Sequence, residues 1–393
     1  MVMATLKSTV LGIEFENPFL LASAPPTARI ESIDKAFQLG WGGAVVKTIT
    51  PDNLEMIEAS PRYAAWKIGS KVYGFENIEM LSHLTVQQWL DGIEYLKIKH
   101  PTKVIIASIM APVVKEQWQN LVRTFNHSKA DAFELNFSCP HGMPEKGIGM
   151  AIGTHPEISA MITEWVKEVA EKPVFVKLSP NVTSIAEITK AVVDAGADGL
   201  AAINTVQSIM GVDLDTFEPM PNINGTSTFG GYSGIAVKPI GLRCVSQIRQ
   251  TTDKPILGIG GISNWRDAAE YITLGADVVQ VCTEVMVNGY GVIKNMSQGL
   301  LSYLENKGLA SPMELKNKAF DKITTHENLN KKRQYYPFID NAMCVKCGKC
   351  VNICDEQEHS ALALDNGIIV DKDKCIGCSL CSIVCSRGAI QMR

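Results

Sequence analysis

Eight cysteines near the end of the chain fall in two runs that share one spacing. The chain has 393 residues and eleven cysteines. In each run, two residues separate the first cysteine from the second and the second from the third, and three residues separate the third from the fourth. The runs are Cys344, Cys347, Cys350 and Cys354, then Cys375, Cys378, Cys381 and Cys385. Thiolates at this spacing ligate [4Fe–4S] clusters. The sequence therefore predicts two such clusters and the transfer of single electrons.

The spacing also indicates which cysteines share a cluster. In bacterial-type two-cluster ferredoxins, the fourth cysteine of each run ligates the cluster of the other run. We therefore assign Cys344, Cys347, Cys350 and Cys385 to one cluster, and Cys375, Cys378, Cys381 and Cys354 to the second. The proline that usually follows the fourth cysteine is replaced by Asp355 and Ser386. We expect this change to affect the cluster potentials but not the ligation.

Zinc knuckles and disulfides are the two alternatives for these cysteines. Structural zinc sites usually pair two C-x2-C units across a longer gap, which fits this spacing poorly. Disulfides require an oxidising compartment, and residues 1–17 lack the basic start and apolar stretch of a signal peptide. The sequence therefore favours the cluster interpretation and a reducing cytoplasm.

Composition is that of an ordinary globular protein. Hydrophobic residues make up 46% of the chain and the net charge is -4, so neither a disordered chain nor a nucleic-acid-binding protein is indicated. No apolar run approaches the roughly 20 residues needed to cross a bilayer, and we expect no membrane association. The length allows a large enzyme domain with an appended module.

Short apolar runs recur between residues 19 and 281, separated by stretches of helical length. Eight runs qualify: FLLASA, GAVVKT, VIIASI, AFELNF, VFVKLS, DGLAAIN, ILGIGG and DVVQVC. Buried parallel strands alternating with helices over about 260 residues are typical of a (β/α)8 TIM barrel. We predict this α/β barrel over residues 1–304, a basic helical connector over 305–340, and a C-terminal ferredoxin-like domain over 341–393. The two cysteine runs start 31 residues apart, as expected for two half-units of that domain.

The residues that follow each predicted strand are the candidates for chemistry, because functional side chains of such barrels gather at the carboxyl ends of the strands. They comprise two lysines, several amides and hydroxyls, glycines and cysteines: Ser23, Lys47, Thr48, Asn136, Ser138, Cys139, Lys177, Asn204, Thr205, Gly260, Gly261, Cys282 and Thr283. A further loop holds Gly230, Gly231, Ser233 and Gly234.

The glycines near the last two strands predict a phosphate cradle, because backbone N–H groups without side chains can point at one anion. A structural glycine turn is the alternative. The GIGGI stretch (258–262) lacks the spacing of a dinucleotide-binding fingerprint, so we expect the phosphate of FMN rather than of NAD. A flavin also converts single electrons into the two-electron chemistry of organic substrates.

Two of these positions have an expected role in flavin chemistry. Lys177 and Lys47 follow apolar residues, and buried lysines are rare. Each is expected to hold negative charge near the flavin ring, with a surface lysine as the alternative.

Cys139 lies on a loop bounded by proline and glycine, and a thiol with its usual pKa of about 8.5 can donate a proton as a general acid. Cys244 and Cys282 are interpreted by default as small packing residues.

With these motifs the chain resembles the dihydropyrimidine dehydrogenase family, of the bacterial NAD-dependent type, and the related dihydroorotate dehydrogenases. The motifs that carry the resemblance are NFSCPHGM (136–143), KLSPNVT (177–183), INTV (203–206), GGYSG (230–234), GIGGI (258–262) and the doubled cysteine run. The resemblance spans nearly the whole chain. Dihydroorotate dehydrogenases share the flavin barrel, but their chain does not end in a two-cluster domain.

The resemblance implies the roles of the strand-end residues. FMN is expected at Ser23, Lys47, Thr48, Lys177, Ser233, Gly234, Gly260, Gly261, Cys282 and Thr283. The pyrimidine is expected at Asn77, Asn136, Ser138, Asn204 and Thr205, since amides complement the alternating donors and acceptors of uracil or thymine. The implied reaction reduces the 5,6-double bond, with hydride from FMN and a proton from Cys139, while His141 helps to position the loop.

The resemblance also implies a partner. Large single-chain members carry FAD and NADPH domains whose motifs do not occur here. We therefore expect a separate FAD-containing, NAD(P)H-oxidising flavoprotein subunit, in a heterotetramer with two copies of each chain. Two alternatives remain: a dihydroorotate dehydrogenase-like enzyme, which would want a cation for the substrate carboxylate, and an electron-transfer subunit without its own substrate.

Overall fold

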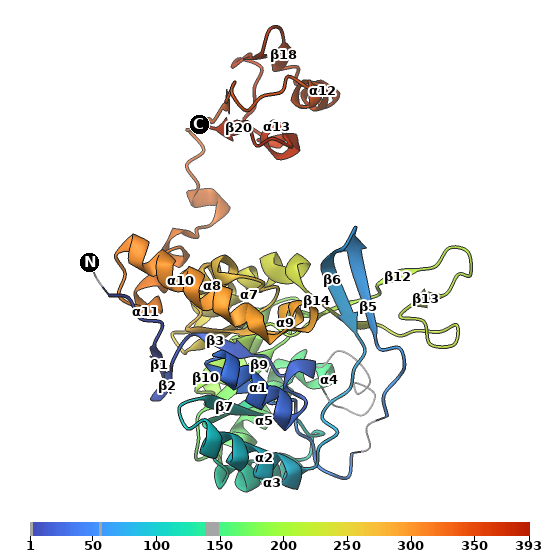
Figure 1. The fold of residues 1–393 in the computed structure, drawn as a ribbon, viewed down its shortest axis with the longest axis vertical. Helices are drawn as coiled ribbons and strands as arrows, with labels where there is room; N and C mark the ends of the chain where they lie inside the picture. Colours follow the sequence, from blue (N-terminus) through green and yellow to red (C-terminus); the bar gives the residue numbers. More distant parts are fainter. Residues whose placement is uncertain (1–2, 55–56, 138–148) are drawn as a thin grey trace. The chain divides into compact units, whose positions relative to one another are not determined.

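The computed structural model describes residues 3–54, 57–137 and 149–393. These residues form two compact units, the first ending at Lys322 and the second running from Ile323 to Arg393 (Figure 1). Each unit is described separately below. In the described part of the chain, no helix has the length and apolar character that crossing a membrane would require.

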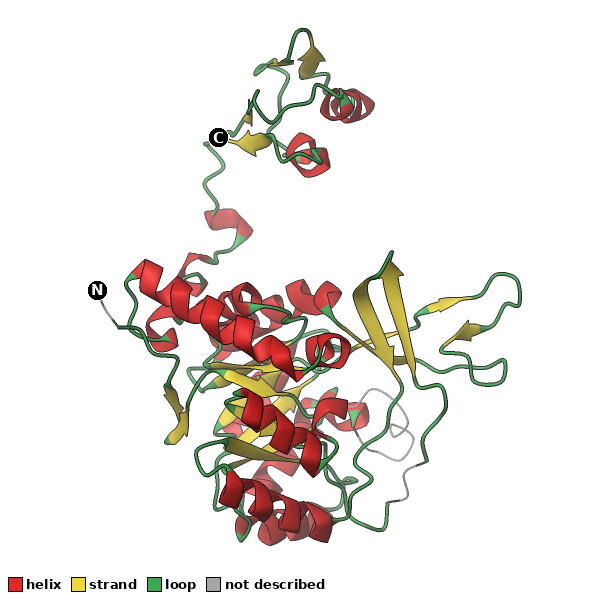
Figure 2. Ribbon diagram, in the orientation of Figure 1, coloured by secondary structure: helices red, strands yellow, loops and turns green. Residues whose placement is uncertain are grey.

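The first unit is built on a closed barrel of eight parallel strands, one for each apolar run seen in the sequence (Figure 2). Around the barrel the order is β10-β15-β16-β3-β4-β7-β8-β9. The strands are β3 (Phe19–Leu21), β4 (Gly43–Val45), β7 (Val104–Ile109), β8 (Ala132–Asn136), β9 (Val174–Leu178), β10 (Gly199–Ala202), β15 (Ile256–Ile259) and β16 (Val278–Val281). The predicted TIM-barrel fold is confirmed.

Helices surround the barrel. They are α1 (Ile30–Leu39), α2 (Val86–Lys99), α3 (Lys115–Asn126), α4 (Met150–Gly153), α5 (Pro156–Lys167), α6 (Ile185–Asp194), α7 (Lys238–Thr251), α8 (Trp265–Thr273), α9 (Thr283–Asn288), α10 (Ile293–Lys307) and α11 (Pro312–Leu315). Local sequence explains several ends. The Thr85 and Asn264 side chains cap the first turns of α2 and α8, and Gly308 ends α10 in the left-handed conformation.

The strands are apolar on both faces because each face packs against a different core. Residues such as Val279 and Val281 point outward into the layer between barrel and helices, whereas Val45, Ile106, Ala132, Phe175 and Val278 fill the barrel interior. The interior also takes Val10 and Phe15 from the antiparallel hairpin β1 (Ser8–Val10) and β2 (Ile13–Phe15). Burial on both faces is the reason why the strands appear in the sequence as continuous apolar runs.

An antiparallel sheet projects from the carboxyl ends of the barrel strands. Its order is β11-β14-β6-β5, with β5 (Tyr63–Ile68), β6 (Lys71–Asn77), β11 (Val206–Ser208) and β14 (Gly230–Ser233). Residues 67–75 form most of the β5–β6 hairpin. A small hairpin, β12 (Gly211–Val212) with β13 (Pro219–Met220), extends between β11 and β14. This projecting sheet brings Asn77 beside the strand-end residues.

Residues 308–336 contain short helical pieces, including the 3-10 turns at Phe320–Lys322 and His326–Asn328. In the second unit, β17 (Pro337–Ile339) pairs with β20 (Ile390–Met392) and β18 (Leu362–Leu364) with β19 (Ile368–Val370). The helices α12 (Lys349–Glu356) and α13 (Leu380–Val384) each begin one residue before the third cysteine of a run. The repeat seen in the cysteine spacing is thus also a repeat of secondary structure.

Candidate functional site

A cavity of about 500 Å³ lies at the carboxyl ends of the barrel strands, beneath the projecting sheet. This volume falls in the range of cofactor and ligand sites. Fourteen of the predicted barrel-site residues line it: Ser23, Lys47, Thr48, Asn77, Asn136, Lys177, Asn204, Thr205, Ser233, Gly234, Gly260, Gly261, Cys282 and Thr283. The remaining two, Ser138 and Cys139, and also His141, lie outside the described residues.

The interior face of the strands changes from apolar to polar toward this cavity. Side chains two residues apart share a face of a strand, so Lys177 follows Phe175 on the interior face of β9, and Glu134 follows Ala132 on β8. On β16, Gln280 follows Val278 in the same way. The barrel therefore ends in a layer of buried polar side chains directly below the cavity.

Both predicted lysines are buried and paired with carboxylates. Lys47 is 7% exposed, and its ammonium lies 3.1 Å from Glu79. Lys177 is 4% exposed, and its ammonium lies 3.4 Å from Glu134, which is completely buried. The alternative of surface lysines is therefore wrong. Each pair places a positive charge at the cavity while the local net charge stays close to zero.

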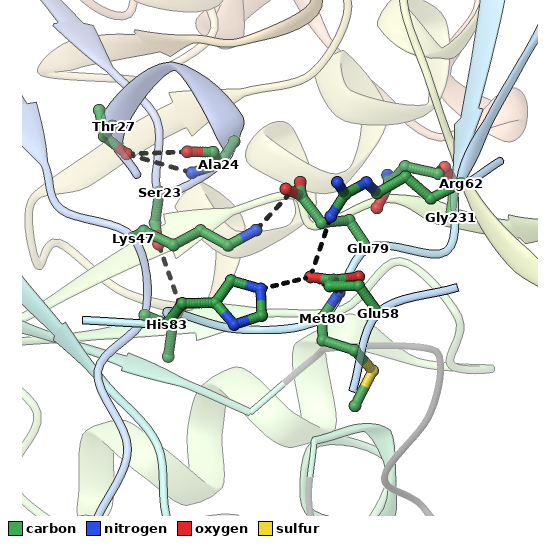
Figure 3. A network of polar contacts seen from close by, with 12 residues as sticks. Ser23, Ala24, Thr27, Lys47, Glu58, Arg62, Glu79, Met80, His83 and Gly231 are labelled. Atoms are coloured by element: carbon green, nitrogen blue, oxygen red, sulfur yellow. Dashed lines mark hydrogen bonds and ion pairs between the residues drawn. The ribbon is translucent and has the colours of Figure 1, made fainter. Parts of the chain in front are cut away.

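Glu79 is held in place by its surroundings (Figure 3). Figure 3 shows the Lys47 ammonium directed at the Glu79 carboxylate, with a second carboxylate, Glu58, below them. The backbone N–H of Met80 donates to both Glu58 oxygens at 3.1 Å, and the His83 ring nitrogen lies 3.2 Å from Glu58. These bonds fasten the chain on either side of β5 and β6 and so fix Glu79 against Lys47.

A chain of hydroxyls and amides runs across the floor of the cavity. The Thr48 hydroxyl lies 3.0 Å from the hydroxyls of both Ser23 and Ser108, and it accepts a hydrogen bond from Asn136 Nδ2 at 2.9 Å. Asn204 Nδ2 in turn donates to Asn136 Oδ1 at 3.3 Å. Residues at the ends of five strands thereby orient each other, and the amides are held in place at the cavity.

Further hydrogen bonds hold the rim of the cavity. Asn77 Nδ2 donates to the Gly231 carbonyl at 3.1 Å, which ties β6 to β14. The Thr205 N–H donates to Asn204 Oδ1 at 2.8 Å. The Ser233 and Thr283 hydroxyls lie 2.8 Å apart. The predicted substrate residues and the predicted flavin residues therefore belong to one connected polar lining.

The predicted phosphate cradle has the backbone that it requires. Gly234, Gly260 and Gly261 all have positive φ angles, +92°, +127° and +68°. A Cβ on Gly261 would come within 2.7 Å of Lys238 N and 2.8 Å of Gly234 O, so only glycine fits. The Tyr271 hydroxyl donates to the Gly260 carbonyl at 2.7 Å and fixes the loop from behind.

Cys282 is the cysteine that lines the cavity among the described residues, and its thiol is protonated. Burial raises the pKa of the Cys282 thiol to about 11, against the partly opposing effect of Lys177. Its Sγ lies 3.7 Å from the Met286 sulfur. At physiological pH the Cys282 thiol therefore lines the cavity as an uncharged group. Cys244, the other barrel cysteine among the described residues, is fully buried in α7 away from the cavity.

Among the polar residues of the site that sequence reasoning missed are Glu79, Glu134 and Gln280. Only residues at or beyond the end of each apolar run were considered, whereas Glu134 and Gln280 lie two positions before the predicted Asn136 and Cys282. The alternation of strand faces would have placed them in the interior. Glu79 follows the predicted Asn77 by two residues, but its pairing with Lys47 depends on the projecting sheet.

In the second unit, one small cavity is lined by Cys354, Cys375, Cys378 and Cys381, the four cysteines assigned from their spacing to the second cluster. Cys350 and Cys381 are buried at the centre of this unit. Within the described residues, no three His, Cys, Asp or Glu side chains converge on the position of a single metal ion. A cubane cluster takes one cysteine per iron, so its ligands stand farther apart.

A parallel barrel with a lysine- and amide-lined cavity at its strand ends, followed by eight cysteines at two-cluster spacing, defines a flavin- and iron–sulfur-containing oxidoreductase. The dihydroorotate dehydrogenase family model matches residues 5–304, and a 4Fe-4S dicluster domain matches residues 337–392. The chain belongs to the dihydroorotate dehydrogenase family, and its cofactors are FMN and two [4Fe–4S] clusters.

Three relatives illustrate the range of similar proteins. The "NAD-dependent dihydropyrimidine dehydrogenase subunit PreA" of Escherichia coli K12 is 39% identical over 98% of this chain and 95% of its own. The chloroplastic "Dihydropyrimidine dehydrogenase (NADP(+))" of Arabidopsis thaliana is 37% identical over 84% of this chain and 80% of its own. The "Dihydroorotate dehydrogenase B (NAD(+)), catalytic subunit" of Pyrococcus abyssi is 37% identical over 79% of this chain and 97% of its own.

The described residues fit FMN. The cavity is large enough for the flavin, Gly234, Gly260 and Gly261 line it with positive-φ backbone that carries no side chain, and a buried oxygen of Gln280, which also lines the cavity, has no hydrogen-bond partner. When bound, FMN exchanges hydride with organic substrates and single electrons with the clusters. Lys47, Lys177 and the glycine loops are the residues that would hold it.

Proposed function

We propose that this chain is the catalytic subunit of a dihydropyrimidine dehydrogenase, which reduces the 5,6-double bond of uracil or thymine. Electrons would arrive through the two [4Fe–4S] clusters. The E. coli relative covers both the barrel and the cluster domain, at 98% of this chain, whereas the P. abyssi dihydroorotate dehydrogenase subunit covers 79%. The whole-chain similarity therefore favours the pyrimidine reaction.

The observation that carries the choice of substrate is the charge balance of the cavity. Its two buried lysines each have a carboxylate partner, Glu79 or Glu134. The third lysine of the lining, Lys71, lies at the tip of the β5–β6 hairpin with its ammonium over the Tyr73 ring. No arginine is among the lining residues in the described ranges. A neutral pyrimidine suits this site better than orotate, whose carboxylate would need a cation of its own.

The asparagine side chains of the cavity are proposed to recognise the pyrimidine. Asn77, Asn136 and Asn204 offer both donors and acceptors, and Thr205 adds a hydroxyl. A site that hydrogen-bonds a substrate edge rejects analogues that leave its groups unpaired. Cys139 is proposed as the general acid that protonates C5 of the pyrimidine, and Ser138 as a further contact. The buried thiol of Cys282, with its raised pKa, is proposed to pack against the flavin.

An anaerobic assay tests this proposal. The chain is purified and its FMN and iron are measured, with about eight irons expected for two cubane clusters. Reduced methyl viologen then supplies electrons, and absorbance follows uracil, thymine and orotate. Loss of the uracil or thymine double bond supports the proposal. Turnover of orotate alone would transfer the assignment to a dihydroorotate dehydrogenase, and bound flavin without any turnover would favour an electron-transfer role.

Two substitutions separate catalysis from folding. Cys139→Ala is expected to lower kcat by about 10²- to 10⁴-fold, the usual contribution of a general acid. The matched control is Cys244→Ala, which removes a buried thiol of α7 and should change stability but not kcat. If both variants reduce uracil at the wild-type rate, Cys139 is not the acid.

We further propose an FAD-containing flavoprotein subunit as the electron donor, in a complex with two copies of each chain. The relative from E. coli is named as a subunit of an NAD-dependent enzyme, which supports the existence of a partner. The test is direct: NADH should reduce the chain only after the partner is added, and light scattering of the mixture should give the mass of two chains of each kind. Reduction by NADH without a partner would contradict this proposal.

A further inference from the structure

Two buried side chains of the site, Glu134 and Gln280, have not yet been given a role in holding a ligand. Glu134 on β8 and Gln280 on β16 are 0% and 1% exposed. They come from strands that are not neighbours in the barrel order, and they meet in the interior, where Gln280 Nε2 donates to Glu134 Oε2 at 2.7 Å. A buried polar contact across a barrel is costly unless its groups are satisfied.

This hydrogen bond fixes the orientation of the Gln280 amide. An ionised carboxylate can only accept hydrogen bonds, so the donor end of the amide must face Glu134 and the carbonyl end must point elsewhere. Gln280 lines the cavity, and its Oε1 is buried without a hydrogen-bond partner. Buried acceptors without partners are rare in folded proteins and usually have a ligand or a water to bind.

Glu134 also links this amide to the lysine of the cavity. Its other oxygen, Oε1, lies 3.4 Å from the Lys177 ammonium. One carboxylate therefore holds a cation from β9 and an amide from β16, both of which line the cavity. Glu134 itself does not line the cavity, so it acts on any ligand only through these two neighbours.

We propose that Gln280 is a further FMN-binding residue, whose Oε1 accepts a hydrogen bond from an N–H or O–H donor of the cofactor, and that Glu134 is the positioning residue that holds its amide. Flavin offers a ring N–H and ribityl hydroxyls as hydrogen-bond donors. Gln280 Oε1, held in a fixed position, would accept from one of them. The inference rests on the flavin site and not on the identity of the substrate.

The first test replaces Gln280 by methionine, which keeps the length of the side chain and removes the acceptor. Holoenzyme is diluted stepwise and released FMN is read by its fluorescence. We expect the FMN dissociation constant to rise about 3- to 10-fold, the range for one hydrogen bond between neutral groups. The control is Gln119→Met, because Gln119 of α3 is also buried and donates to a glutamate, Glu168, but lies outside the cavity lining.

The outcome is decided by comparison of the two variants. An FMN dissociation constant that rises in Gln280→Met and stays at the wild-type value in Gln119→Met supports the proposal. If Gln280→Met keeps the wild-type value, or if both variants rise equally, Gln280 does not bind the flavin. Uracil plays no part in this assay, so its result is independent of the proposed substrate.

The second test addresses Glu134. Glu134→Asp keeps the charge opposite Lys177 but withdraws the acceptor from Gln280, so FMN affinity should fall as in Gln280→Met. If Glu134 acts through the amide, the double variant should lose no more affinity than Gln280→Met alone. If the fold-losses of FMN affinity in the two single variants multiply in the double variant, Glu134 does not act through Gln280. The flavin midpoint potential, measured by spectroelectrochemistry, should also shift in both single variants, which a purely structural defect in folding would not produce.

Discussion

The glycine cradle gives the sharpest prediction about cofactor binding. Gly261 and Gly308 have nearly the same φ angle, +68° and +67°, so alanine at either position costs about 1–2 kcal/mol of left-handed backbone strain. The surroundings differ. A Cβ on Gly308 meets nothing within 4 Å, whereas a Cβ on Gly261 lies 2.7 Å from Lys238 N. To reach ordinary contact at 3.4 Å, the two segments of the cradle must separate by about 0.7 Å.

The expected effects follow from that difference. Overpacking adds about 1–3 kcal/mol of destabilisation to Gly261→Ala, and displacement of the cradle should weaken FMN binding at least 10-fold, equivalent to about 1.4 kcal/mol. Gly308→Ala should show the strain alone, with unchanged FMN affinity. FMN release on dilution gives the affinity. Urea unfolding followed by tryptophan fluorescence gives the stability of the first unit, since all six tryptophans lie between residues 41 and 265.

The refuting result is simple to recognise. If Gly261→Ala binds FMN as tightly as Gly308→Ala, the phosphate does not lie in this cradle. If both variants lose stability equally, the close contact with Lys238 is relieved without cost. Either result would remove the steric argument for glycine at residue 261 and would direct attention to the Ser233–Thr283 side of the cavity.

Three further predictions concern stability and reactivity. Tyr271→Phe should destabilise the first unit by about 1–3 kcal/mol in urea, because the Gly260 carbonyl loses its buried donor; an unchanged midpoint would contradict this. Although burial disfavours its charge, hydrogen bonds led by the one from Lys99 lower the pKa of Asp34 to about 2. The free energy of unfolding of the wild type should therefore exceed that of Asp34→Asn by its full amount above about pH 5, and the difference should shrink as pH falls from about 4 to 2. A difference that stays constant with pH would exclude this coupling. Since burial raises the pKa of Cys282 to about 11, iodoacetamide at pH 8 should leave it unmodified in peptide mass maps of the holoenzyme, and rapid alkylation would show that the thiol is accessible.

The electron-transfer character and the barrel could be predicted from the sequence because both are encoded over short distances. Cysteines two or three residues apart must lie close together in any fold, so their spacing alone indicates clusters. Barrel strands such as those ending at Val45 and Leu178 are buried on both faces and therefore appear as unbroken apolar runs. The strand-end rule then located Lys47, Lys177, Asn136 and Asn204, which the structure brings to one cavity.

The partners of these residues were decided by tertiary structure alone. Glu134 and Gln280 are 146 residues apart and meet only because the barrel closes with a particular register. Glu79 reaches Lys47 only because residues 63–77 fold into the projecting sheet. Local spacing shows which groups are available for chemistry. The closure of the barrel decides which charges neutralise one another and leaves the acceptor Gln280 Oε1 without a hydrogen-bond partner. Such contacts depend on the stagger of distant strands rather than on neighbours in the chain.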